Sequence, residues 1–217
     1  MISGYLMKAI SNVLGDKDNY SLEELATIES INIERNINFE ELKQLPNLHE
    51  IKMFDLNLSM VELGALSFLD NLKNIYFINC DIDSLQALSG LSLDTLCIDN
   101  CVVNGIEYLN TMQIKSLYLD NLGTIDLDDI SVIRNIENIS FNNTEVLNEE
   151  KLIFLDKVVK LCLAGTGIKK IDTLIANETL EYLVIDEDIY KNNINEVKEL
   201  NSRGVKVVDS MNQVMGV

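Results

Sequence analysis

The sequence is short of proline, histidine, cysteine and basic residues. It has one proline, one histidine and four cysteines among 217 residues, with 17 lysines and arginines against 35 aspartates and glutamates. A single histidine, and cysteines without a paired C-x-x-C spacing, exclude the usual zinc-binding patterns. We therefore expect reduced thiols and neither a metal nor a cofactor.

The deficit of basic residues gives a formal net charge of −18. Nucleic acids and anionic membrane surfaces bind proteins through clusters of lysine and arginine, so this charge argues against both as partners. It favours a protein partner of basic or mixed charge. A well-solvated acidic surface without a basic partner is the alternative explanation of the same composition.

Long apolar runs are also missing. None approaches the roughly 18–20 residues that a membrane-spanning helix needs, so we expect no membrane insertion. Residues 1–14 lack the charged, apolar and cleavage regions of a signal peptide. Together with reduced cysteines, this favours the cytoplasm, and the alternative is secretion or the cell surface.

What the sequence does contain is a repeated frame of apolar residues. Residues 93–101 read L-x-x-L-x-L-x-x-C, and the alternation of Leu96 and Ile98 with other residues predicts a half-buried strand. The frame recurs with its first apolar residue at positions 28, 48, 72, 114, 136, 158 and 180. Successive copies start 20 to 24 residues apart, a period typical of leucine-rich repeats.

These repeats predict an α/β fold, a right-handed leucine-rich repeat solenoid with a parallel sheet on its concave face. The strands should centre near residues 31, 51, 75, 96, 117, 139, 161 and 183. We expect a helical N-terminal cap at 1–27, about eight repeats at 28–186, and a C-terminal helix, last strand and tail at 187–217. The C-terminal helix should start near residue 189 and end at Gly204.

The longer frame L-x-x-L-x-L-x-x-(N/C/T)-x-(I/V)-x-x-(L/I)-x-x-L occurs in 72–91, 93–112 and 158–174, and a capping box of Ser21 and Glu24 precedes the repeats. These motifs resemble the short leucine-rich repeats of bacterial internalin-like proteins, over about residues 20–208. The resemblance implies a shared scaffold and no particular ligand. The chain departs from it in having no regular asparagine ladder, no signal peptide and no wall-anchoring tail.

The ninth position of the frame predicts a structural column, because short polar groups there can bond the backbone where the chain leaves the strand. The column comprises Asn36, Leu56, Cys80, Cys101, Leu122, Thr144 and Thr166. By this frame Cys80 and Cys101 should be buried and unreactive, whereas Cys97 and Cys162 should be partly accessible.

The remaining strand positions should face outward on the concave side, where equal positions of neighbouring strands form rows. Exposed aromatic side chains among carboxylates are typical of protein-binding hot spots. Strand propensity and cross-strand pairing are the alternative explanation. The predicted partner-binding residues are Lys52, Phe54, Tyr76, Ile78, Cys97, Asp99, Tyr118, Asp120, Asn142 and Tyr182.

The hypothesis is therefore a protein–protein interaction module that binds its partner on the concave face. The alternative is a structural or targeting repeat segment of a larger protein, including a surface-associated one. An enzyme is disfavoured, because the frame places His49, the sole histidine, away from the inner row that holds Cys97 and Cys162.

Overall fold

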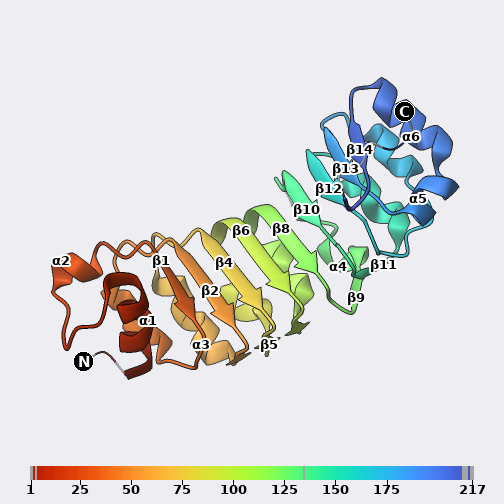
Figure 1. Ribbon diagram of the computed structural model, residues 1–217. Coiled ribbons are helices and arrows are strands. Elements are labelled where there is room, and N and C mark those ends of the chain that lie inside the picture. The colour runs from red at the N-terminus through yellow and green to blue at the C-terminus, as the bar shows by residue number, and fades with distance from the viewer. Residues whose placement is uncertain (1, 3, 134, 212–214, 216–217) are drawn as a thin grey trace. The chain divides into compact units, whose positions relative to one another are not determined.

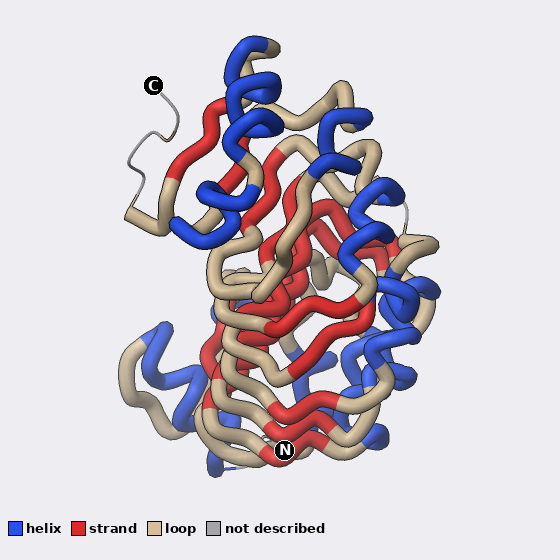
Figure 2. The backbone as a smooth tube through the Cα atoms, turned by 90° about the vertical axis from the view of Figure 1, so that its right-hand side faces the viewer, coloured by secondary structure: helices blue, strands red, loops and turns tan. Residues whose placement is uncertain are grey.

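The computed structural model divides into two compact units, residues 1–112 and 113–217. It describes residues 2, 4–133, 135–211 and 215. Within each unit, strands lie side by side and helical segments lie on the opposite side of the core (Figures 1 and 2). Each unit is thus a stack of strand-and-helix repeats that bury apolar side chains between their two layers.

The first unit begins with two helices, α1 (Gly4–Leu14) and α2 (Leu22–Leu25). Ser21 and Glu24 form the predicted capping box, because the Ser21 side chain accepts from the Glu24 N–H and Glu24 accepts from the Ser21 N–H. Helix α1 packs against the first strand through its buried residues Leu6, Ala9 and Ile10.

Four parallel strands follow in the order β1 (Ser30–Ile33), β2 (Glu50–Phe54), β4 (Asn74–Ile78) and β6 (Ser92–Asp99). Equal repeat positions pair, as Ile51 does with Ile75. A second, short parallel sheet contains β3 (Asn57–Leu58), β5 (Asp81–Ile82) and β7 (Val102–Val103).

The return segments of the first unit are short helices, which suits apolar residues that recur at about every third position, such as Ile82, Leu85 and Leu88. They are η1 (Phe39–Gln44), α3 (Met60–Gly64), η2 (Ala65–Phe68), η3 (Leu85–Leu88) and η4 (Ile106–Thr111). The longest repeat, 24 residues between positions 48 and 72, accommodates its extra length in the α-helical turn α3. Pro46 follows η1, since proline cannot continue the helix.

The second unit has five parallel strands in the order β8 (Gln113–Asp120), β10 (Asn138–Ser140), β12 (Lys160–Cys162), β13 (Tyr182–Val184) and β14 (Lys206–Val208). Strands β9 (Thr124–Asp126) and β11 (Glu145–Leu147) form a separate parallel pair. The helical segments are α4 (Leu127–Ile130), η5 (Glu149–Phe154), η6 (Asp172–Ala176), α5 (Glu187–Asn192) and α6 (Ile194–Ser202).

The core confirms the predicted repeat frame. The fourth and sixth positions point inward, and Ile75, Phe77, Leu96 and Ile98 have no measurable exposure. The positions between them, such as Tyr76 and Cys97, are half-buried on the other face of the sheet. The strand positions and the leucine-rich repeat fold that the sequence predicts are therefore correct.

The predicted single C-terminal helix is wrong, because α5 and α6 are separate and meet at Asn193. The Asn193 side chain is 3% exposed and accepts from the Ile171 N–H at 3.1 Å. Its amide nitrogen donates to the Lys169 and Ile189 carbonyls at 2.9 and 2.8 Å. A buried amide that joins two repeats therefore outweighs the continuous apolar face that predicted one helix.

The ninth-position column is buried from Leu56 onward, whereas Asn36 at its start is exposed. The Thr144 hydroxyl donates to the Leu119 carbonyl at 2.7 Å and accepts from the Leu122 N–H at 3.0 Å. The Cys101 thiol similarly accepts from the Cys80 N–H at 3.2 Å. The short polar groups therefore bond the backbone as predicted.

A second column, not predicted from the sequence, lies one position before the ninth. Asn79, Asn100, Asn121 and Asn143 all adopt left-handed backbone conformations with φ between 52° and 56°. Within the first unit Asn100 donates to Asn79 at 2.7 Å, and within the second unit Asn143 donates to Asn121 at 3.2 Å. Asparagine tolerates this conformation better than other side chains do, so its recurrence at position eight indicated the turn.

Candidate functional site

The open face of each sheet, the one opposite the core, presents the strand residues that point away from the buried frame. Strands β2 and β4 both alternate half-buried and buried residues along their length. This alternation follows from the pleat, in which successive side chains point to opposite faces. The ten predicted partner-binding residues all lie half-buried on this side or at strand ends, six in the first unit and four in the second.

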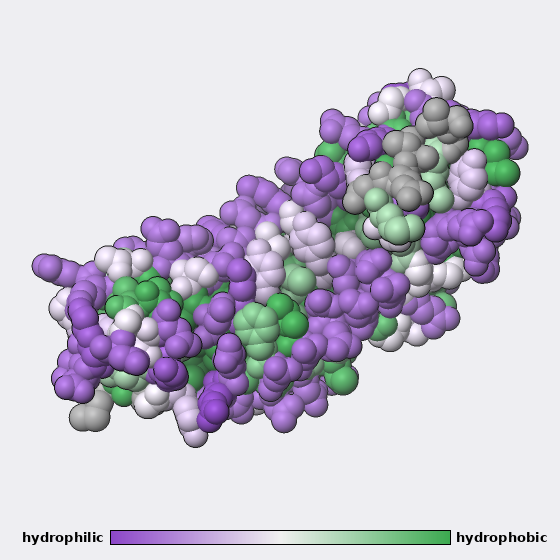
Figure 3. Space-filling view, in the orientation of Figure 1, coloured by the Kyte–Doolittle hydropathy of each residue, from purple (hydrophilic) through white to green (hydrophobic). Residues whose placement is uncertain are grey.

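The first unit brings its six predicted residues together in two rows. Lys52 pairs with Tyr76, which in turn pairs with Cys97. Two residues further along each strand, Phe54 pairs with Ile78, which in turn pairs with Asp99. We name Phe54, Tyr76, Ile78 and Cys97 the first-unit patch, since they form a contiguous apolar and aromatic surface. Figure 3 shows apolar side chains among hydrophilic ones over these strands.

Charged groups border the first-unit patch. The Lys52 ammonium lies 3.0 Å from a Glu50 carboxylate oxygen and 5.2 Å from the Tyr76 ring centroid. The Ser30 hydroxyl donates to the same Glu50 oxygen at 2.8 Å. Burial opposes ionisation of Glu50, but the hydrogen bonds from Ser30 and Lys52 outweigh it and hold the pKa of Glu50 below its usual range. Lys52 is therefore already paired with a carboxylate.

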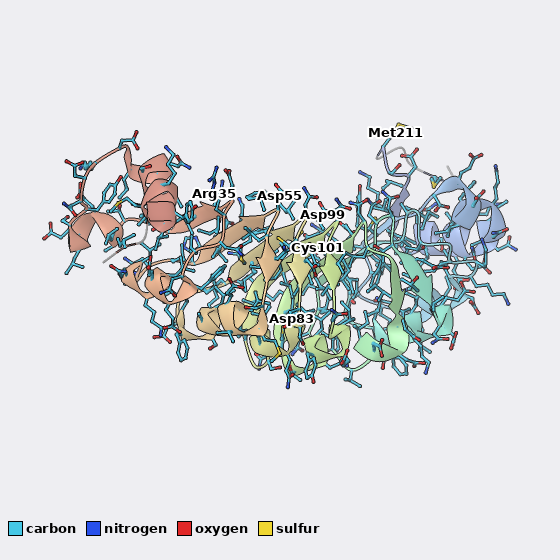
Figure 4. All side chains as sticks on the ribbon, turned by 90° about the horizontal axis from the view of Figure 1, so that it is seen from below. Arg35, Asp55, Asp83, Asp99, Cys101 and Met211 are labelled. Carbon is cyan, nitrogen blue, oxygen red and sulfur yellow. The ribbon has the colours of Figure 1, made fainter. Side chains whose placement is uncertain are left out.

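Carboxylates also follow the ends of these strands. Figure 4 shows Arg35, Asp55 and Asp99 along one side of the first unit, with Asp83 on the other side. Asp55 has a φ of 56° and donates its N–H to the Ile78 carbonyl at 3.1 Å. The rim of the first-unit patch is therefore mixed in charge, with Asp99 in the same row as Phe54 and Ile78.

The second unit places its four predicted residues in one groove of about 500 Å³. Tyr118 and Asp120 come from β8, Asn142 follows β10, and Tyr182 comes from β13. Lys160, Cys162, Ser140 and Asp209 also line it, although they were not among the predicted binding residues. The repeat frame could have found the first three, because each occupies an outward position of its strand. Asp209 follows the last strand, outside the periodic pattern.

The Asp120 carboxylate is held in place by hydrogen bonds from neighbouring residues. It accepts from the Ser140 hydroxyl at 2.6 Å and from the Asn142 N–H at 2.9 Å. Ser140 is 7% exposed, so this network forms the floor of the groove. We name this surface the second-unit groove.

The thiols have the predicted exposure. Cys80 and Cys101 are buried, Cys97 and Cys162 are half-buried, and none of the four is in a disulfide. Burial is the main cause that raises the pKa of the Cys162 thiol. The hydrogen bond to Cys80, followed by burial, raises the pKa of Cys101. Since the thiolate is the nucleophile, these two environments do not activate Cys162 or Cys101. The hydrogen bond with Cys101 is the main cause that lowers the pKa of Cys80 to about 7, but Cys80 is buried.

No group of three or more metal-ligating side chains occurs among the residues with described positions. In the same part of the chain, no helix has the length and hydropathy needed to cross a bilayer.

Two solved structures have the same architecture. Internalin C2 from Listeria monocytogenes superposes with a TM-score of 0.67 and 19% sequence identity, over 95% of this chain and 93% of that chain. The fold is that of the internalin leucine-rich repeat. Internalin F from the same organism gives a TM-score of 0.55 and 15% identity, over 95% of this chain and 74% of that chain.

The resemblance predicted from the repeats is thereby confirmed at the level of the fold. At these identities the likeness to internalins defines the scaffold and leaves the ligand open. No protein-family model matches the sequence, and no curated protein sequence matches it.

Proposed function

We propose that the chain is a protein-binding module and that the first-unit patch contacts its partner. The observation that carries the proposal is the matched register of Phe54 with Ile78 and of Tyr76 with Cys97. Aromatic and apolar side chains in one contiguous patch with a charged rim have the composition of an interface core. The internalin fold supports the proposal, because stacked repeats present extended surfaces suited to binding.

The partner is a protein of basic or mixed charge. The chain carries a formal net charge of −18, and Asp99 lies in the row of Phe54 and Ile78. Lys52, the basic residue in the Tyr76 row, is neutralised by Glu50. A partner whose apolar centre is bordered by basic side chains therefore matches this surface.

The proposal includes no catalytic step. The partly accessible thiols are Cys97 and Cys162, and burial raises the pKa of Cys162. A binding role instead uses Cys97 as a small apolar contact beside Tyr76.

Photo-cross-linking tests the proposal. A photoreactive amino acid at position 52 or 97 would be activated in extract of the source cells, and the captured protein would be purified and its affinity measured. Tyr76→Ala should weaken binding by about 30-fold, because truncating a hot-spot aromatic costs about 2 kcal/mol. Phe68→Ala is the matched control, since Phe68 is an aromatic side chain of the first unit, 58% exposed on η2 rather than on the strands.

Equal binding by the wild type, Tyr76→Ala and Phe54→Ala would contradict the proposal. A loss in Phe68→Ala alone would place the interface on the helical side. Circular dichroism of each variant would show that a change in affinity does not come from unfolding.

A further inference from the structure

The second-unit groove differs chemically from the first-unit patch. Two half-buried tyrosines, Tyr118 and Tyr182, line it. Most of the other lining side chains are polar, including Asp120, Asn138 and Asn142. At about 500 Å³ the groove is within the usual size range of ligand sites, and its lining combines fixed polar groups with apolar surface.

The polar groups of the groove are fixed in position by one another. Ser140 and the Asn142 N–H both bond Asp120, at 2.6 and 2.9 Å. The Asn138 amide nitrogen donates to the Ser116 hydroxyl at 3.0 Å. A bonded network of this kind keeps its donors and acceptors oriented before a ligand arrives, which lowers the entropy cost of binding.

This arrangement selects for a ligand rich in hydroxyl groups. An apolar partner would remove water from the carboxylate and amides without replacing its hydrogen bonds, which is unfavourable. Hydroxyl groups can both donate to carboxylates and accept from amides. Tyrosine rings provide apolar faces together with a polar tip, so they can contact the C–H faces of a polar ligand.

We infer that the second-unit groove binds a neutral oligosaccharide. Asp120 and Asp209 are matched by Lys160 and by Lys206, whose ammonium lies 5.5 Å from the Tyr182 ring centroid, so the charges of the groove favour neither an anionic nor a cationic sugar. Strands β8 and β13 are three positions apart in the sheet of the second unit, about 14 Å at the usual strand spacing. A single sugar ring is too short to contact both tyrosines, whereas a linked chain of sugars can. The groove is a separate site, so the inference does not depend on the first-unit patch binding a protein.

The test uses four defined neutral probes on the full chain: maltotetraose, cellotetraose, mannotetraose and tetra-N-acetylchitotetraose. Saturation-transfer NMR detects binding, and calorimetry measures affinity at up to about 10 mM sugar, the range of a weak single site. At least one tetrasaccharide should bind. Its monosaccharide should bind at least about ten-fold more weakly, because a single sugar can contact only one of the two tyrosine rings.

Tyr118→Ala and Tyr182→Ala should each lower the affinity for that tetrasaccharide about ten-fold or more, while Tyr118→Phe should retain binding because the ring face remains. Tyr76→Ala is the matched control, since Tyr76 has the same frame position as Tyr118 but lies in the first unit. Should Tyr118→Ala unfold the chain, Asp120→Asn replaces it and should weaken binding by removing the charged acceptor.

Three results would overturn the inference. The first is that none of the four sugars binds. The second is binding that neither tyrosine substitution changes, and the third is an equal loss in the Tyr76→Ala control. If the groove instead bound a peptide, and lost it in Tyr118→Ala without binding any sugar, the ligand class would be wrong.

Discussion

Replacing Asn177 by alanine should destabilise the second unit strongly. Asn177 is 4% exposed, and its amide nitrogen donates to the Leu155 and Val158 carbonyls at 2.7 and 3.0 Å. Its oxygen accepts from the Thr179 and Leu180 N–H groups at 2.8 and 2.9 Å. The side chain thus joins the segment after η5 to the turn before β13, two consecutive repeats of the solenoid.

The cost can be worked out from the groups that lose a partner. The Val158 carbonyl retains the Thr179 hydroxyl at 3.1 Å, and Thr179 is exposed enough for water to reach its N–H. The Leu155 carbonyl retains the Val158 N–H at 3.2 Å, so the Leu180 N–H is the buried group that is left unpaired. At about 1–3 kcal/mol for a buried group without a partner, the free energy of unfolding should fall by about 2 kcal/mol.

Urea denaturation followed by circular dichroism measures the change, as a shift of the midpoint at constant slope. Asn195→Ala is the matched control, because Asn195 is exposed on α6, and its effect should stay within about 0.5 kcal/mol. A loss below about 1 kcal/mol in Asn177→Ala would refute the reasoning, because it would show that water satisfies the Leu180 N–H.

Three further predictions follow from the turns, the thiols and Glu50. Gly165→Ala should cost more stability than Gly167→Ala in the same urea assay. Both glycines have positive φ, but only a Cβ at Gly165 would lie 2.5 Å from the Asn143 side-chain oxygen. Equal losses of stability would contradict this close approach. In native thiol titration Cys97 and Cys162 should react before Cys80 and Cys101, and simultaneous reaction of all four would contradict the described burial. The folded-state pKa of Glu50 is lowered, so ionised Glu50 stabilises the wild type relative to Glu50→Gln above the ordinary glutamate pKa of about 4.3. This stability difference should vanish as the pH falls through the lower folded-state pKa. A difference that stays constant down to low pH would refute the prediction.

The periodic part of the fold could be predicted from the sequence because one physical requirement recurs in every repeat. Each strand must bury its fourth and sixth positions, and residues such as Ile75 and Phe77 satisfy that requirement wherever they occur. The broken C-terminal helix could not be predicted in this way. Its decisive residue, Asn193, acts through hydrogen bonds to residues about 22 positions earlier, which periodicity does not reveal.

In the candidate site too, the periodic features could be predicted from the sequence and the non-periodic ones could not. The repeat frame placed Tyr76 beside Cys97 and Phe54 beside Ile78, and the register confirms both pairs. It did not predict that Ser140 would hold Asp120, because a serine in an outward column has no periodic feature that distinguishes a buried hydroxyl from an exposed one. The hydrogen bonds to Asp120, and the presence of Asp209 in the second-unit groove, could be found only from the three-dimensional structure.

The internalin fold persists at 19% identity because the two faces of each strand are under different constraints. An inward residue such as Leu96 has no exposure and must remain apolar and of similar size, or a cavity or clash results. An outward residue such as Tyr76 or Ser140 has no such requirement from the core, so the apolar first-unit patch and the polar second-unit groove can occupy the same scaffold. The ligand must therefore be argued from the outward side chains of this chain, unit by unit, and tested there.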